Sequence, residues 1–117
     1  MSEVVYELAH IGINTQNQEE AMAVAALFAQ IFNLQVRNGK NSVYAGNAVE
    51  VMKSPGRGRL GHIGIGTPDC EAAVKDLESR GFEVDMNAAK YRPDGTLNVV
   101  YLKQEVGGFA VHIVRKP

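Results

Sequence analysis

The sequence predicts an α+β fold in which a strand, a helix and three further strands occur twice. Two observations lead to this prediction. The segment at residues 8–15, LAHIGINT, returns 52 residues later at residues 60–67 as LGHIGIGT, with a histidine at the same place. Both copies alternate with period two, as half-buried strands do, and each is followed by helix-capping residues. Self-similarity at a fixed spacing indicates an internal duplication.

Length and composition limit what the duplicated chain can be. It has 117 residues, of which 45% are hydrophobic, and a formal net charge of −1. A core of this size needs no disulfide, and Cys70, as the only cysteine, cannot form one within the chain. The near-zero charge predicts no nucleic-acid partner, and the sequence has neither a membrane-length apolar run nor a signal-peptide pattern. We therefore expect a single cytoplasmic domain over residues 1–117.

The first unit is expected to cover residues 1–53, with a strand at 8–14, a helix at 18–32 and strands at 34–37, 42–45 and 49–53. Asn17, with Glu20 three residues later, forms a capping box at the helix start. Turns are predicted at Asn38-Gly39 and at 46–47. The helix's expected core stripe consists of Ala21, Val24, Ala25, Phe28, Ile31 and Phe32. The opposite side of this helix is also apolar. There are two interpretations: the helix is simply alanine-rich, or a partner covers that side.

The second unit is expected to cover residues 60–117, after a Gly/Pro-rich linker at 54–59. A strand at 60–66 precedes a helix that Thr67 caps, with Pro68 in its first position, and that Gly81 ends. A strand at 82–85 follows, and then an insertion at 86–98 with a turn at 92–95. Strands at 99–103 and 109–115 complete the unit. The helix's first turn also contains Cys70, which we interpret as an ordinary helix position.

Four chemistry-bearing side chains occupy repeat-equivalent places on the predicted strands: His10, Glu50, His62 and His112. In each strand the branched residues take the alternate positions that face the core, so these four side chains point away from it. Their neighbours are mostly small, which leaves room on that face. The four side chains converge if the two units curl against each other.

Imidazole and carboxylate groups are natural ligands for zinc, iron(II), nickel, manganese or cobalt. We therefore expect one divalent metal ion, which acts as a Lewis acid toward a carbonyl or enolate oxygen or activates water. Taken singly, each histidine can instead be a structural hydrogen-bonding group, and Glu50 a solvated or ion-paired residue. Four further residues are candidates for binding a substrate carboxylate or phosphate, with solvated surface or cross-strand pairing as the alternative. They are Arg37, Tyr44, Tyr101 and Lys103.

The duplicated βαβββ pattern, with these four residues on the first and last strands of each unit, resembles the vicinal oxygen chelate superfamily of glyoxalases, bleomycin-resistance proteins and extradiol dioxygenases. The resemblance covers nearly the whole chain. It implies a glyoxalase-like half-barrel of mixed sheet with outer helices, metal ligands at positions 10, 50, 62 and 112, and a homodimer. In glyoxalase I these positions commonly hold His, Glu, His and Glu, so His112 departs from that pattern.

A closer resemblance, to the small module associated with bacterial 2-dehydro-3-deoxyphosphogluconate/4-hydroxy-2-oxoglutarate aldolases, is seen in several stretches. They are ELAHIGINT at 7–15, AG at 45–46, VEVMKSP at 49–55, KY at 90–91 with DG at 94–95, YLK at 101–103 and GGFAVH at 107–112. In that module the last ligand position is regularly His. The resemblance implies a metal-dependent enzyme domain of lyase or isomerase type that chelates vicinal oxygens of a small oxo-acid or sugar-acid-like substrate. The alternatives are a non-catalytic ligand-binding or regulatory module of the same fold and an extradiol-type dioxygenase.

Overall fold

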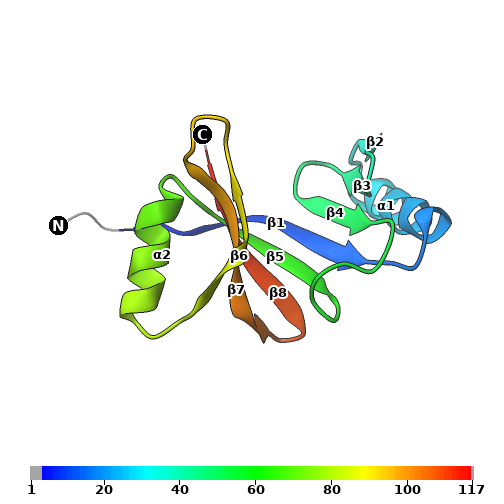
Figure 1. Cartoon of the computed structure of the whole chain (residues 1–117). Helices are drawn as coiled ribbons and strands as arrows, with labels where there is room; N and C mark the ends of the chain where they lie inside the picture. The colour runs from blue at the N-terminus through cyan, green and yellow to red at the C-terminus, as the bar shows by residue number, and fades with distance from the viewer. Residues whose placement is uncertain (1–3, 117) are drawn as a thin grey trace. The chain divides into compact units, whose positions relative to one another are not determined.

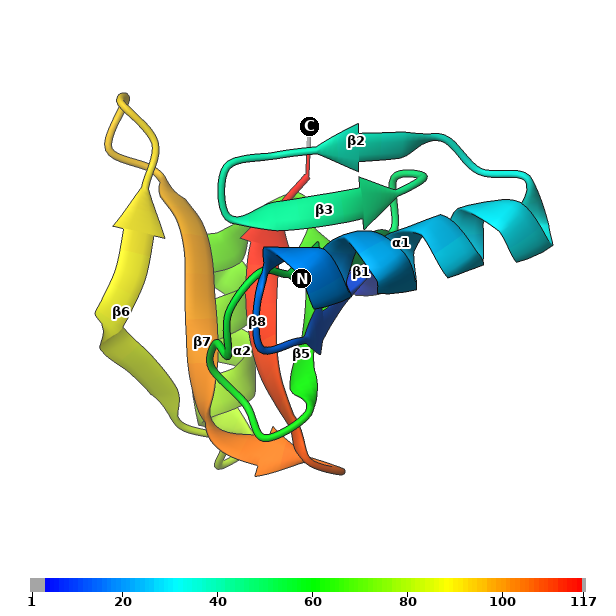
Figure 2. The same cartoon turned by 90° about the vertical axis from the view of Figure 1, so that its right-hand side faces the viewer.

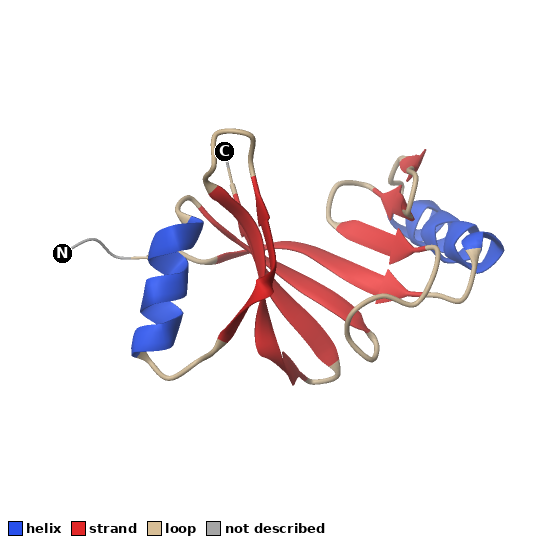
Figure 3. Ribbon diagram, viewed as in Figure 1, coloured by secondary structure: helices blue, strands red, loops and turns tan. Residues whose placement is uncertain are grey.

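The computed structural model describes residues 4–116, and over these residues the chain forms eight strands and two helices (Figures 1 and 3). The strand–helix–three-strand order occurs twice, which confirms the predicted duplication and the α+β class. The chain divides into two compact units, His10–His62 in one and the residues up to Ala9 together with those from Ile63 onward in the other. Both boundaries fall inside the repeated segments.

The His10–His62 unit contains most of β1 (Glu7–Asn14), then α1 (Gln18–Phe32), β2 (Val36–Asn38), β3 (Ser42–Ala45) and β4 (Val49–Met52). Its strand order is β2-β3-β4-β1, with β1 parallel to β4 and the other pairs antiparallel. Helix α1 lies against β3 and β4, and Figure 2 shows it beside β3. The buried core between them consists of Ala21, Ala25, Val43, Ala45 and Val51.

Helix α1 has the predicted bounds and the predicted cap, because the Asn17 side chain accepts the Glu20 backbone N–H at 2.8 Å. The predicted core stripe is wrong at its C-terminal end, where Ile31 and Phe32 are each 62% exposed. The reason is length. Fifteen helical residues span about 22 Å, whereas the four-residue strands beneath them span about 13 Å, so the last turn extends past the sheet.

The hairpin between β2 and β3 differs from the predicted Asn38-Gly39 turn. Asn38 remains in β2, where it pairs with Val43, and neither Asn38 nor Gly39 has a positive φ. The Gly39 N–H instead donates to the Ser42 carbonyl at 2.8 Å, so the connection runs over residues 39–41. The second predicted turn is confirmed, with Gly46 at φ 66°.

The other unit contains β5 (Gly61–Thr67) from Ile63 onward, α2 (Cys70–Ser79), β6 (Val84–Tyr91), β7 (Leu97–Val106) and β8 (Phe109–Arg115). Its strand order is β5-β8-β7-β6, and β6, β7 and β8 pair antiparallel. Its core gathers residues from α2 and three strands. They are Cys70, Ala73, Leu77, Val84, Leu97, Val100 and Ile113.

The predicted insertion is mostly strand. Instead of ending at residue 85, β6 continues to Tyr91, and β7 begins at Leu97 rather than at 99. The predicted turn at 92–95 closes this hairpin, with the Gly95 N–H donating to the Arg92 carbonyl at 2.9 Å. Cross-strand pairing between Tyr91 and Leu97 extends the ladder to the turn itself. The added residues therefore lengthen one hairpin instead of forming a loop.

Helix α2 begins two residues later than predicted. Asp69 is the N-cap, because its side chain accepts the Ala72 N–H at 3.0 Å, and Thr67 ends β5. Cys70 is therefore the first helical residue, and it is fully buried. Burial raises the pKa of its thiol, which fits the interpretation of Cys70 as an ordinary helix position. Neither helix in the described part of the chain has the length and apolar composition needed to cross a bilayer.

We expect Asp69→Ala to lower the free energy of unfolding by about 1 kcal/mol, because it removes the side-chain oxygen that caps the start of α2. Asn17→Ala is the matched variant for α1 and should cost a similar amount. Urea unfolding followed by circular dichroism measures both. If Thr67→Ala lowered the free energy of unfolding more than Asp69→Ala does, the result would favour Thr67 as the N-cap, as the sequence predicted.

Candidate metal site

A row of paired residues crosses the sheet of the His10–His62 unit. Arg37 in β2 is opposite Tyr44 in β3, Tyr44 is opposite Glu50 in β4, and Glu50 is paired with Gly12 in β1. Residues that are directly opposite each other share one face of a sheet. The row therefore places a guanidinium, a phenol, a carboxylate and a residue without a side chain next to one another.

Gly12 makes room for His62. A Cβ atom at position 12 would lie 2.0 Å from Cε1 and 2.2 Å from Nδ1 of the His62 imidazole, far inside van der Waals contact. The ring therefore occupies the space above Gly12, beside Glu50. His62 is only 6% exposed.

Three of the four predicted ligands meet at this place. Oε1 of Glu50 lies 3.2 Å from Nε2 of His62 and 3.9 Å from Nε2 of His10. The two imidazoles meet edge to face, with ring centroids 5.1 Å apart. The structure thus brings His10, Glu50 and His62 together within one compact unit.

Two hydroxyl groups hold the second oxygen of Glu50. Ser42 donates to Oε2 at 2.8 Å and Tyr44 donates to it at 3.0 Å. Together with the hydrogen bond from His62, which is the largest cause, these contacts lower the pKa of Glu50 to about 2. Burial lowers the pKa of His10, and the neighbouring His62 adds to this effect. At neutral pH Glu50 is therefore ionised and His10 is neutral, the protonation states in which carboxylate and imidazole bind metals.

The donor separations agree with a shared metal ion. Two N or O atoms bound to one ion at about 2.0–2.2 Å lie at most about 4.4 Å apart. The Glu50–His62 and Glu50–His10 separations of 3.2 and 3.9 Å fall within this limit. Two imidazoles and one carboxylate also suit zinc, iron(II), nickel, manganese and cobalt. The residues present therefore fit the predicted ion.

We expect Glu50 to make the metal-free protein less stable in acid. A carboxyl whose pKa falls from 4.5 in the unfolded chain to about 2 in the folded one stabilises the fold fully above pH 4.5. That contribution is lost as the pH falls from 4.5 toward 2. The free-energy difference between wild type and Glu50→Gln, measured by urea unfolding with a chelator present, should therefore shrink over this range. A difference that stays constant with pH would contradict the prediction.

His112 and Tyr101 lie in the other unit. They are directly opposite each other in β8 and β7, with ring centroids 4.9 Å apart, and His112 is 8% exposed. Tyr101 is directly opposite His112 in the same way that Tyr44 is directly opposite Glu50. This agreement is expected if Glu50 and His112 are repeat-equivalent. Ligation of the metal by His112 stays a prediction.

The remaining substrate candidates differ in their surroundings. The Arg37 guanidinium lies over the Tyr44 ring, 4.1 Å from its centroid, beside the His10–Glu50–His62 cluster. Lys103 is 59% exposed and forms an ion pair with Glu83 at 3.6 Å. Ser42 was not among the predicted site residues. The sequence could have indicated it, because Ser42 lies two residues before Tyr44 in the same predicted strand, so the two side chains share one face.

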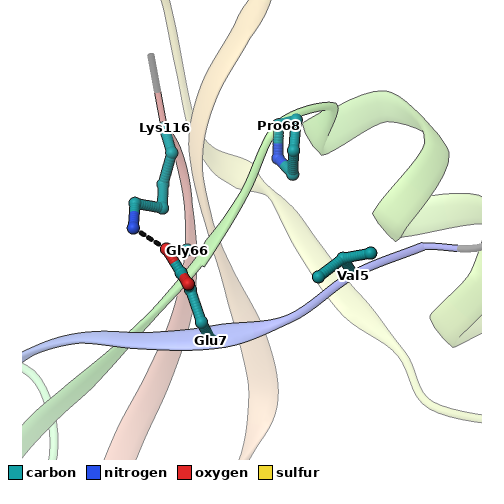
Figure 4. A pocket seen from close by; sticks show the side chains of 5 residues that line it. All are labelled: Val5, Glu7, Gly66, Pro68 and Lys116. Atoms are coloured by element: carbon teal, nitrogen blue, oxygen red, sulfur yellow. Dashed lines mark ion pairs between the residues drawn. The ribbon is translucent and has the colours of Figure 1, made fainter.

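A separate small pocket lies in the unit that contains the residues up to Ala9 and those from Ile63 onward (Figure 4). Its volume is about 210 Å³, and it is lined by Val5, Glu7, Gly66, Pro68 and Lys116. Lys116 and Glu7 form an ion pair at its edge. None of the predicted site residues lines this pocket, and its two charged groups neutralise each other.

The chain has the glyoxalase-like fold of several solved structures. One is a hypothetical protein from Bacillus halodurans C-125, with a TM-score of 0.66 and 18% identity over 96% of this chain and 95% of that one. Another is a methylmalonyl-CoA epimerase in complex with methylmalonyl-CoA and NH4+, with a TM-score of 0.64 and 16% identity over 93% of each chain. The methylmalonyl-CoA epimerase of Mycobacterium tuberculosis has a TM-score of 0.61 and 14% identity over 94% of this chain and 87% of that one. No protein-family model and no curated protein matches the sequence.

Proposed function

We propose that this chain is a divalent-metal-dependent enzyme domain of lyase or isomerase type that binds two vicinal oxygens of a small oxo-acid or sugar-acid-like substrate. The observation that supports the proposal best is Glu50, an ionised carboxylate with one oxygen directed at two imidazoles. Further support comes from the fold, which the chain shares with methylmalonyl-CoA epimerases. We keep the association with 2-dehydro-3-deoxyphosphogluconate/4-hydroxy-2-oxoglutarate aldolases as part of the proposal.

His10, Glu50 and His62 would hold the ion, and His112 is the proposed fourth ligand. When bound, a divalent ion withdraws electron density from a substrate carbonyl and so acidifies the neighbouring C–H bond. Ser42 and Tyr44 keep Glu50 in place. Arg37, which forms no ion pair with an Asp or Glu in the described part of the chain, would hold the substrate carboxylate.

The first test is elemental analysis of the purified full chain. We expect about one zinc, nickel, iron, manganese or cobalt ion per chain. The second test incubates the metal-loaded protein with small 2-oxo acids and with methylmalonyl-CoA in D2O and follows exchange of the α-hydrogen by NMR. Exchange with an oxo acid supports the proposal.

The alternatives give different results in the same experiments. A non-catalytic binding module would bind an oxo acid, seen as chemical-shift changes, without exchanging its hydrogen. A dioxygenase would consume oxygen in the presence of a catechol, which an oxygen electrode detects. Release of pyruvate from 4-hydroxy-2-oxo acids would indicate a lyase rather than an isomerase.

We further propose a homodimer, with His112 supplied either by the same chain or by a second copy. Size-exclusion chromatography with light scattering measures the oligomeric state. Mixing His10→Ala chains with His112→Ala chains separates the two arrangements. Metal binding returns on mixing only if one copy supplies His112 to the other copy's His10, Glu50 and His62.

A further inference from the structure

The two oxygens of Glu50 have different surroundings. Oε1 lies near His62 and His10, at 3.2 and 3.9 Å from their Nε2 atoms. Oε2 accepts hydrogen bonds from both Ser42 and Tyr44. A carboxylate oxygen offers two lone pairs, so the two hydroxyls use the acceptor capacity of Oε2. Oε1 accepts the hydrogen bond from His62, at 3.2 Å. A metal ion bound by both groups would replace the proton between these two atoms, so Oε1 is the oxygen that can pass from the hydrogen bond to the ion.

The sheet itself sets up this asymmetry. Ser42 and Tyr44 are two residues apart in β3, so their side chains share one face. Tyr44 is directly opposite Glu50, whereas Ser42 is opposite Met52 and reaches Glu50 diagonally. Ser42 is only 3% exposed, so water competes little for its hydroxyl. Arg37 stacks on the Tyr44 ring and restricts its movement.

We infer that Ser42 and Tyr44 are positioning residues that make Glu50 a one-oxygen metal ligand, bound through Oε1. This inference rests on the proposed function. Without the two hydroxyls the carboxylate is free to rotate about its Cγ–Cδ bond and to present both oxygens to the ion. Residues that orient a ligand in this way contribute about 10–100-fold to metal affinity.

The test titrates the full chain with Co2+, followed by its visible absorption, in wild type, Tyr44→Phe, Ser42→Ala and the double variant. We expect the Kd for Co2+ to rise about 10–100-fold in the double variant. Ser42→Thr keeps a hydroxyl and should keep the wild-type Kd. Tyr6→Phe is the matched control, because it also removes a tyrosine hydroxyl that donates to a carboxylate, that of Asp76 at 2.5 Å in the other unit.

A spectroscopic readout separates positioning from a general loss of stability. Infrared difference spectra, zinc-bound minus metal-free, report the separation of the two carboxylate stretching bands, which narrows when both oxygens bind the ion. A signal absent in Glu50→Gln is assigned to Glu50. We expect a wide separation in wild type and in Tyr6→Phe, and a narrower one in the double variant.

Two results would overturn the inference in distinguishable ways. If wild type binds Co2+ and the double variant binds it with the same Kd and band separation, Ser42 and Tyr44 do not position Glu50, and the proposed function stands. If wild type binds no Co2+ at all, the proposed function and the inference both fail. Circular dichroism of each variant shows whether it is folded, and Tyr44→Phe, which keeps the ring under Arg37, tests the same point with least disturbance.

Discussion

Purified His62→Ala protein is expected to contain almost no bound metal, whereas wild type contains about one ion per chain. His62 is buried, and its Nε2 atom is the nitrogen closest to the carboxylate of Glu50 in the His10–Glu50–His62 cluster. Metal binding of about 10–16 kcal/mol, divided over four ligands, gives about 3 kcal/mol for each, or more than 100-fold in Kd. Elemental analysis after gel filtration measures the loss.

The controls separate loss of a ligand from loss of the fold. Thr67→Val changes a buried polar residue in the same strand, β5, without removing a nitrogen donor, and should keep the metal. His62→Gln keeps most of the side-chain volume but lacks the imidazole, and this variant should lose the bound metal. Metal at less than one ion per ten chains in wild type, unchanged in His62→Ala, would remove the basis for a metal enzyme.

Much of the fold could be predicted from the sequence because the same order of strands and helix occurs in both halves, so each half supports the prediction for the other. Helix α1 has the bounds that its capping box and apolar pattern predict, and strands β3 and β8 also match. The errors occurred where a local signal has two solutions. Thr67 and Asp69 are both good capping residues, and only the end of β5 decides between them. Whether Ile31 and Phe32 are buried depends on how far the sheet extends beneath α1. The periodicity of apolar residues along a helix gives no information about the length of the sheet.

The sequence predicted which residues form the candidate site, but it did not predict the hydrogen bonds that hold Glu50. Alternation along the strands placed His10, Glu50 and His62 on one face, and the small neighbours marked the space above them. The hydrogen bond from Ser42 to Glu50 was missed because it is diagonal: Ser42 is opposite Met52, and Tyr44 is the residue directly opposite Glu50. Cross-strand pairs become visible only when the register is known.

Gly12→Ala is expected to disrupt the same site through packing, without touching a ligand. The new Cβ would lie 2.0–2.5 Å from three atoms of the His62 ring, so the ring must move away from Glu50. Overpacking of this kind costs about 1–3 kcal/mol of stability. Because Gly12 does not have a positive φ, alanine introduces no strain of that kind, and the three atoms nearest to its Cβ all belong to the imidazole. We expect metal content to fall nearly as far as in His62→Ala.

A double-mutant cycle tests this cause directly. If the Cβ collides with the imidazole, Gly12→Ala should destabilise wild type but change the unfolding free energy of His62→Ala by little, since the colliding ring is gone. Gly56→Ala is the matched control. That glycine also lacks a positive φ, but its Cβ would meet only Oδ1 of Asn14, at an ordinary 3.5 Å. Equal destabilisation by Gly12→Ala in both backgrounds, measured by urea unfolding, would show that His62 does not occupy the space above Gly12.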